Sequence, residues 1–251
     1  MKIGWFISMI LTTVGFALIG VATAQDTVTK TDHALKSFAD SLRSHGIEIS
    51  KQALTIALSN NDPEVRALAA NQLAQDHDSD AIPSIEQALS NEKDSRTRVE
   101  ISSALWALGD SKGANELQAM CSTASLPIAV TIEAVQNLQM VHLSTSGCVT
   151  TVLESLKKVE SIDYRADILS LFPAMYIDST DNQAGQIVSV SENLLSDTTQ
   201  QPAVRMSASH VLAQIKSSSS AAVVRSALLR ESDPIVQASL KEDLKVLEKQ
   251  Q

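Results

Sequence analysis

The chain has 251 residues and is acidic, rich in aliphatic side chains and poor in aromatic ones. Only 3% of its residues are aromatic, and it has 8 Gly and 6 Pro. This disfavours a β-sandwich or barrel, because such folds need many turns and many strand-forming aromatic residues. The formal net charge of -9 disfavours a nucleic-acid-binding protein, which must neutralise phosphates with clustered Lys and Arg. Composition therefore predicts a helical globular protein rather than a disordered or collagen-like chain.

The N-terminal segment has the pattern of an export signal. Lys2 is the only charged residue in residues 1–24, and an uncharged, mostly apolar run covers residues 3–21. Small residues at Ala22 and Ala24 match the cleavage pattern of a secretory signal. We therefore expect residues 1–24 to be a cleaved signal peptide and the remainder to be periplasmic or secreted. Alternatively, the apolar run is long enough to remain as an N-terminal anchor in the inner membrane.

After the signal, one helical pattern recurs at intervals of 32 to 40 residues. Each copy has mostly apolar or small residues at offsets 0, 4, 5 and 8, a spacing that places them on one face of a helix. The copies begin at Val65, Thr97, Val130, Tyr164, Val204 and Val236. Further apolar-periodic segments, each predicting a helix, occupy residues 31–44, 50–60, 81–91, 113–121, 148–159, 183–195 and 221–230.

The predicted repeating unit is therefore a helix, a short turn and a second helix. A single pair of such helices cannot bury its own apolar stripe, so neighbouring pairs must stack. We expect residues 25–251 to form a single all-α solenoid of about six to seven repeats with one continuous core. Asp62 and Asp233 each precede a proline, as expected at helix starts. Pro173 falls late in its helix and is expected to kink or end it.

Several repeat positions carry a family resemblance. The strongest stretch runs from Ala81 to Leu89 and continues with Asp94, Arg98 and Leu108-Gly109-Asp110. It resembles HEAT repeats, and particularly the short HEAT-like repeats of the phycobilin lyase family. The resemblance implies a structural ladder between repeats, formed by the Asp before each helix and the Arg at offset 1. The ladder residues are Asp62, Arg66, Asp94, Arg98, Arg165, Arg205 and Asp233.

The two cysteines give conflicting indications. Cys121 and Cys148 are an even pair in a chain expected to be exported, which favours a disulfide. However, Cys121 ends one helix of the second type and Cys148 begins the next, and such helices run parallel in stacked repeats. A helix of about 10 residues is roughly 15 Å long, whereas a disulfide needs Cα atoms within about 7 Å. A disulfide and two buried free thiols are therefore both possible.

The sequence contains no pattern that predicts a catalytic, cofactor or metal site. Its five His residues lack partners at zinc-ligand spacing, and there is no nucleotide-binding or hydrolase motif. Residues 76–80 hold three alternating Asp, but Ala81 and Gln87 replace the Gly and Glu of a calcium loop. We interpret this segment as a capped turn, with a weak cation site as the alternative. Trp106, at offset 9, either packs at a repeat junction or anchors a partner.

These features predict a non-catalytic exported scaffold that binds a protein or peptide through its helical repeat surface. The acidic charge favours a partner of basic or mixed charge. Two alternatives are a membrane-tethered envelope assembly factor, if the N-terminal segment is retained, and a lyase-like enzyme or enzyme partner, which the family resemblance implies. The export signal opposes the lyase alternative, because pigment attachment in that family is cytoplasmic.

Overall fold

The computed structural model describes residues 37–217 and 219–249. Within these ranges every regular element is a helix, and there are thirteen α-helices and two short 3-10 helices. None of the described helices combines the length and apolar character that crossing a bilayer requires. The predicted signal peptide at residues 1–24 and the start of the predicted helix at residues 31–44 lie outside the described residues.

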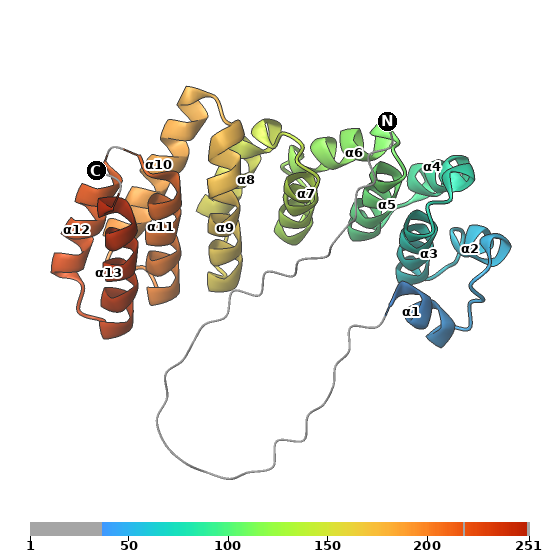
Figure 1. Cartoon of the computed structure of the whole chain (residues 1–251), viewed down its shortest axis with the longest axis horizontal. Coiled ribbons are helices and arrows are strands. Elements are labelled where there is room, and N and C mark those ends of the chain that lie inside the picture. Colours follow the sequence, from blue (N-terminus) through green and yellow to red (C-terminus); the bar gives the residue numbers. More distant parts are fainter. Residues whose placement is uncertain (1–36, 218, 250–251) are drawn as a thin grey trace, which may run out of the picture. The chain divides into compact units, whose positions relative to one another are not determined.

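The helices form two layers, which Figure 1 shows as two rows. The odd layer contains α3, α5, α7, α9, α11 and α13, and each of these helices packs on the next one, with α1 packed on α3. The even-numbered helices form the second layer. The bounds of all the described α-helices, in chain order, are α1 (Phe38–Ser44), α2 (Lys51–Ala57), α3 (Pro63–Gln75), α4 (Ile82–Asn91), α5 (Ser95–Ala107), α6 (Ser111–Cys121), α7 (Ile128–Met140), α8 (Val149–Lys158), α9 (Ile162–Asp178), α10 (Asp181–Ser196), α11 (Pro202–Ile215), α12 (Ser220–Arg230) and α13 (Pro234–Glu248). The predicted all-α solenoid of stacked helix pairs is confirmed.

Local chemistry explains where the helices begin and end. The side chain of Asp62 accepts a hydrogen bond from a backbone N–H in the first turn of α3, and Asp94 and Asp233 do the same for α5 and α13. Gly109 follows α5 with a φ of +89°, a conformation that glycine adopts without steric cost. Pro173 lies inside α9, which continues to its end at Asp178, so the proline does not end the helix. Burial of α9 between α7 and α11 offsets the lost backbone hydrogen bond.

The core is divided, which corrects the expectation of one continuous core. One apolar cluster extends from α1 to α5, and the other extends from α5 to α13. The two meet at α5, where Ile101 and Leu105 belong to the first cluster and Val99 to the second. At the junction with α6, a Cβ added to Gly113 would lie 2.2 Å from the carbonyl oxygen of Ser102. Because backbones pack this closely, little space remains there for the large side chains that would join the clusters.

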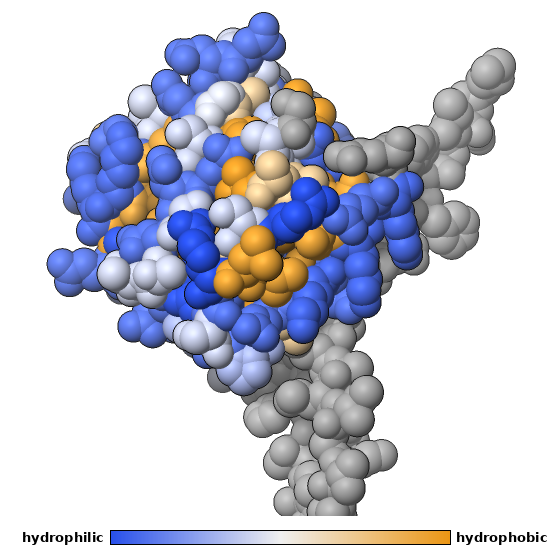
Figure 2. Space-filling view, turned by 90° about the vertical axis from the view of Figure 1, so that its left-hand side faces the viewer, coloured by the Kyte–Doolittle hydropathy of each residue, from blue (hydrophilic) through white to orange (hydrophobic). Residues whose placement is uncertain are grey.

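The C-terminal end of the odd layer is capped by charge. Offset 5 is fully buried in the first five copies, where it holds Ala70, Ser102, Val135, Leu169 and Ser209. In the last copy this position is Lys241, and Lys245 follows one turn later, both exposed. Figure 2 faces this end and shows a mainly hydrophilic surface around a small apolar patch. The lysines therefore make this surface of α13 polar, a property that terminal repeats require for solubility.

Candidate functional site

The ladder residues lie at the turns before the odd-layer helices, but Asp and Arg do not pair as predicted. Arg66 donates to both carboxylate oxygens of Glu92, at 2.6 and 2.7 Å, and to the carbonyl oxygen of Asn60 at 2.7 Å. Arg205 makes the same two-pronged contact with Glu231, at 2.8 and 3.0 Å. Both pairs join residues 26 positions apart. Through these hydrogen bonds, each arginine connects the turn before its own helix with the turn before the next odd-layer helix.

Three further copies keep the carbonyl contact and have a different second partner or none. Arg98 donates to the carbonyl oxygen of Glu92 at 3.0 Å and pairs with Glu116 on α6. Arg165 donates to the carbonyl oxygen of Val159 at 2.8 Å. In the last copy Gln237, at the Arg position, donates to the carbonyl oxygen of Glu231 at 2.6 Å. The offset-1 side chain thus reaches back five or six residues in five of the six copies.

The predicted pairing of Asp with Arg is wrong for a geometric reason. Asp62, Asp94 and Asp233 use their carboxylates to accept backbone N–H groups at the helix starts. Glu92 and Glu231, two residues before Asp94 and Asp233, accept the hydrogen bonds of Arg66 and Arg205 instead. Burial would raise the pKa of Glu92, but hydrogen bonds from Arg66 and from two backbone N–H groups hold that pKa below its usual value.

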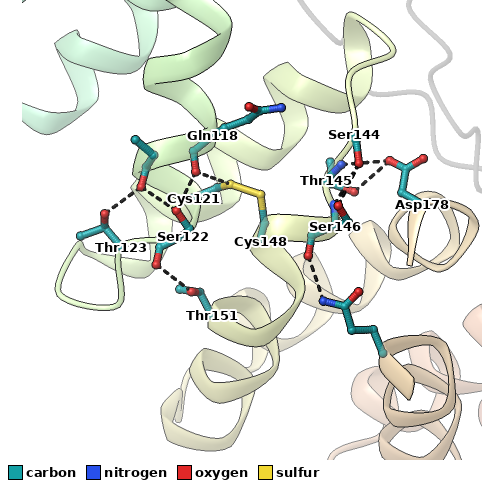
Figure 3. The surroundings of a disulfide bond; sticks show 12 residues. Gln118, Cys121, Ser122, Thr123, Ser144, Thr145, Ser146, Cys148, Thr151 and Asp178 are labelled. Carbon is teal, nitrogen blue, oxygen red and sulfur yellow. Dashed lines mark hydrogen bonds between the residues drawn. A yellow bond between two sulfur atoms is a disulfide. The ribbon is translucent and has the colours of Figure 1, made fainter. Parts of the chain in front are cut away.

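The turn before α7 is held differently. Its offset-1 residue is Thr131, a short buried side chain, and the disulfide between Cys121 and Cys148 lies beside this turn. The Cα atoms of the two cysteines are 5.2 Å apart, and the Thr151 hydroxyl donates to the carbonyl oxygen of Ser122 at 3.1 Å (Figure 3). A covalent bond and one hydroxyl thus hold the turn before α7, where four of the other copies have an arginine and the last has Gln237.

The geometric objection to the disulfide is wrong. It assumed that α6 and α8 lie side by side in parallel, which would separate the two cysteines by a helix length. Instead the last turn of α6 packs against the short 3-10 helix Ser146–Cys148 that precedes α8. The end of one helix therefore meets the beginning of the next, as Figure 3 shows. Both cysteines are buried at this meeting point.

The segment before Cys148 is fixed from a second side. The backbone N–H and the hydroxyl of Thr145 both donate to one carboxylate oxygen of Asp178, at 3.0 and 3.3 Å. The side chain of Gln183 donates to the carbonyl oxygen of Ser146 at 3.0 Å. Residues 144–148 therefore connect α6 with the end of α9 and the beginning of α10, and they hold the middle of the odd layer in place.

The exposed side chains of α5, α7 and α9 form a surface that we call the odd-helix face. It consists of offsets -1, 3, 6 and 10 in the copies that begin at Thr97, Val130 and Tyr164, and of Ile177 in the last turn of α9. These positions are exposed or half-buried and lie on the side of each helix opposite its buried residues. Because α5, α7 and α9 pack in sequence, their stripes form one continuous surface.

Carboxylates occupy the same position on all three helices of this face. Offset 3 is Glu100 on α5, Glu133 on α7 and Asp167 on α9, and we call these three residues the carboxylate row. At the same offset, the copies toward the two ends of the layer have the uncharged residues Leu68, Ser207 and Ser239. The row is therefore confined to the middle of the odd layer.

Glu133 is electrostatically strained. Its side chain is only 21% exposed, and burial together with a hydrogen bond to the Glu100 carboxyl group raises its pKa to about 7. The guanidinium of Arg96, 3.4 Å away, opposes this shift, but that side chain is 77% exposed. Glu100 also accepts a hydrogen bond from Asn71 at 2.9 Å. At alkaline pH the face therefore holds a negative charge that its surroundings compensate poorly.

Large apolar side chains are exposed on the same face, toward the C-terminal ends of the helices from the carboxylate row. Met140 is 71% exposed and Ile177 is 81% exposed, at the C-terminal ends of α7 and α9. Trp106 does not belong to this face: it is half-buried in α5, and its backbone N–H group lies against Gly113 of α6, so the residue occupies a helix junction. Met140 and Ile177 therefore expose apolar side chains to water on the same face as the carboxylate row.

Inspection of the sequence for catalytic motifs missed the odd-helix face. The sequence signal for this face is the recurrence of Glu or Asp at offset 3 in three successive copies.

The acidic turn at residues 76–80 has a simpler role, because Lys51 pairs with Asp78 at 2.8 Å and with Asp80 at 3.2 Å. Among the described residues there is no cluster of side chains suited to holding a metal ion.

Comparison with known proteins identifies the type of repeat. Residues 51–139 match the family model for HEAT repeats. This part of the chain is therefore similar to HEAT repeats, as the resemblance implied, and it lies within an all-α stack of helix pairs. No curated protein matches the chain.

Two solved structures are similar to the chain at low identity. Human deoxyhypusine hydroxylase in complex with glycerol is 15% identical, with a TM-score of 0.41, over 79% of this chain and 73% of that chain. The complex of CpcE and CpcF of phycocyanin lyase from Nostoc sp. PCC7120 is 14% identical, with a TM-score of 0.36, over 80% of this chain and 95% of that chain.

Proposed function

We propose that this protein is a non-catalytic exported scaffold that binds a protein or peptide partner through the odd-helix face of α5, α7 and α9. The exposure of Met140 and Ile177 on that face carries the proposal. Two large apolar side chains left in water at neighbouring helix ends gain free energy when a partner covers them. The stacked core holds these helices in fixed positions, so the face is already formed before a partner arrives.

The disulfide supports the exported location. Disulfides persist in oxidising compartments and are rare in the cytosol of most organisms. The bond between Cys121 and Cys148 joins two buried residues at the turn that lacks an arginine, where it has a structural role. Together with the signal pattern of residues 1–24, this favours a periplasmic or secreted protein over a cytoplasmic one. N-terminal sequencing of the mature protein tests cleavage and separates this location from a tethered one.

Site-specific crosslinking tests the binding face. A photoreactive p-benzoylphenylalanine replaces Gln136, which is exposed on α7 in the odd-helix face, or Thr150, which is exposed on α8 in the even layer. In cells that produce the full chain, we expect Gln136→p-benzoylphenylalanine to crosslink one protein in stoichiometric amounts and the Thr150 variant to crosslink little of it. Equal yields at both positions, or a crosslink from Thr150 alone, would contradict the proposed face.

A further inference from the structure

We infer that the partner presents a basic amphipathic helix, with Lys or Arg side chains against the carboxylate row and apolar side chains against Met140 and Ile177. This inference rests on the proposed function and adds the chemistry and shape of the partner segment. It follows from three properties of the odd-helix face: its charge, the spacing of its carboxylates and the position of its apolar residues.

The charge of the face is one-sided. Offsets -1 and 3 of α5, α7 and α9 hold four carboxylates, from Glu100, Glu133, Asp163 and Asp167, and one guanidinium, from Arg96. Helices α7 and α9 contain a single basic residue, Arg165. Its guanidinium donates to the carbonyl oxygen of Val159 at 2.8 Å and to the side chain of Gln200 at 2.7 Å, at the turns rather than on the face. A cationic segment is therefore the complement of this surface.

The spacing of the row fits a helix that lies across α5, α7 and α9. Neighbouring packed helices are about 8–10 Å apart, so carboxylates at one offset recur at roughly that interval. On a crossing helix, basic residues seven positions apart are separated by about 10 Å on one side. Three such residues would meet Glu100, Glu133 and Asp167 in order.

The apolar residues lie at the right distance from the row for the same helix. Met140 is two turns beyond Glu133 on α7, roughly 10 Å along the axis, and Ile177 lies farther along α9. A helix with its side chains is about 10–12 Å wide. One crossing helix can therefore place its basic side on the carboxylate row and its apolar side on Met140 and Ile177.

Other hollows of the described residues offer no comparable complement. A groove of about 480 Å³ between α2 and α4 is lined by Arg66 and Glu92, whose charges already satisfy each other. A groove of about 470 Å³ on α13 carries both signs, from Lys241, Lys245 and Glu242. The odd-helix face differs from these two grooves in carrying an excess of negative charge together with the exposed side chains of Met140 and Ile177.

A defined peptide tests the inference. The probe is a fluorescently labelled 21-residue helical peptide of Lys and Leu, with Lys on one side and Leu on the other, and its partner probe replaces each Lys by Glu. Binding is measured by fluorescence anisotropy with the full folded chain at pH 8 and about 0.15 M salt, where screening weakens distant charges. The test variant is Glu100→Gln, Glu133→Gln and Asp167→Asn combined. The matched control is Glu48→Gln, Glu160→Gln and Asp181→Asn, which removes the same charge from exposed positions outside the odd-helix face.

We expect the row variant to raise the Kd of the Lys/Leu peptide at least tenfold, the control to change it less than twofold, and the Glu/Leu peptide not to bind. Equal weakening by both variants, no effect of the row variant, or no binding by the unmodified chain would overturn the inference. The variant Met140→Ser with Ile177→Ser separates the two levels of the argument. If it abolishes the crosslink from Gln136 while the row variant changes no Kd, the binding face stands and the basic helix is rejected.

Discussion

The ends and the middle of the odd layer use one repeat frame with different chemistry. Toward the ends, Arg66 and Arg205 make the same buried contact with a glutamate 26 residues later, and the offset-3 positions are uncharged. In the middle, α7 has Thr131 at the arginine position, with the Cys121–Cys148 disulfide beside its turn. Arg98 and Arg165 on α5 and α9 have partners other than a glutamate 26 residues later, and the offset-3 positions of all three helices are carboxylates. The repeat frame therefore determines how the helices stack. The contacts that hold the turns and the residues at exposed positions vary from copy to copy. The middle differs from the ends in both respects, and this is the region to which we assign binding.

Removal of the disulfide should have the largest effect. The bond closes a loop with a sequence separation of 27 residues, and a loop of that length corresponds to about 3.5 kcal/mol of stability. We expect Cys121→Ala with Cys148→Ala to lower the free energy of unfolding by about that amount in urea titration. If the urea midpoint stays unchanged, the turn before α7 does not depend on the covalent bond, and the contrast with the ends disappears.

Loss of the ion pair between Arg205 and Glu231 should lower the free energy of unfolding slightly less than loss of the disulfide. The side chains of Arg205 and Glu231 are only 8% and 7% exposed, so Arg205→Ala leaves a buried carboxylate without its guanidinium. We expect a loss of about 3 kcal/mol in the free energy of unfolding. The matched control is Arg165→Ala, because Arg165 binds uncharged oxygens of Val159 and Gln200 and its removal strands no carboxylate. The control should lose about 1 kcal/mol. Equal losses would show that the carboxylate pair adds nothing to the end.

Replacement of Gly113 tests the boundary between the two core clusters. A Cβ at position 113 would meet the carbonyl oxygen of Ser102 at 2.2 Å, so Gly113→Ala must push α6 away from α5. We expect a destabilisation of about 2 kcal/mol by calorimetry. Gly185→Ala is the control, since nothing lies within 4 Å of its added Cβ and alanine favours the helix. A neutral Gly113→Ala would mean that the two clusters are not separated by close backbone packing.

A separate test concerns the pH dependence of stability in the middle of the odd layer. Because the folded chain raises the pKa of Glu133 from 4.5 to about 7, the folded state holds a proton that the unfolded state releases. This contribution to stability is present below pH 4.5 and is lost as pH rises toward 7. Comparison of urea midpoints across this range should show a steeper decline for the unmodified chain than for Glu133→Gln. Parallel curves would show that Glu133 titrates normally and that the carboxylate row is not strained.

The repeat frame made most of the fold predictable, because offsets 0, 4, 5 and 8 depend only on helical periodicity. The hydrogen-bond partners of the offset-1 residues were harder to predict. The contact of Arg66 with Glu92 requires knowledge of how one turn lies against the next, although a Glu two residues before Asp94 and Asp233 was a visible signal. The sequence left the disulfide open, because the frame says nothing of the stagger between α6 and α8. The carboxylate row was present in the sequence and needed only comparison at one offset.

The central claim is that the partner binds the middle of the odd layer and not its ends. The chain offers a matched series for this test, since offset 6 of the six copies is Asn71, Ser103, Gln136, Ser170, His210 and Glu242. Each residue is replaced in turn by p-benzoylphenylalanine, and the yield of the crosslinked partner is measured. We predict high yields at Ser103, Gln136 and Ser170 and low yields at the other three positions. A flat profile, or one with its maximum at either end, would contradict the account.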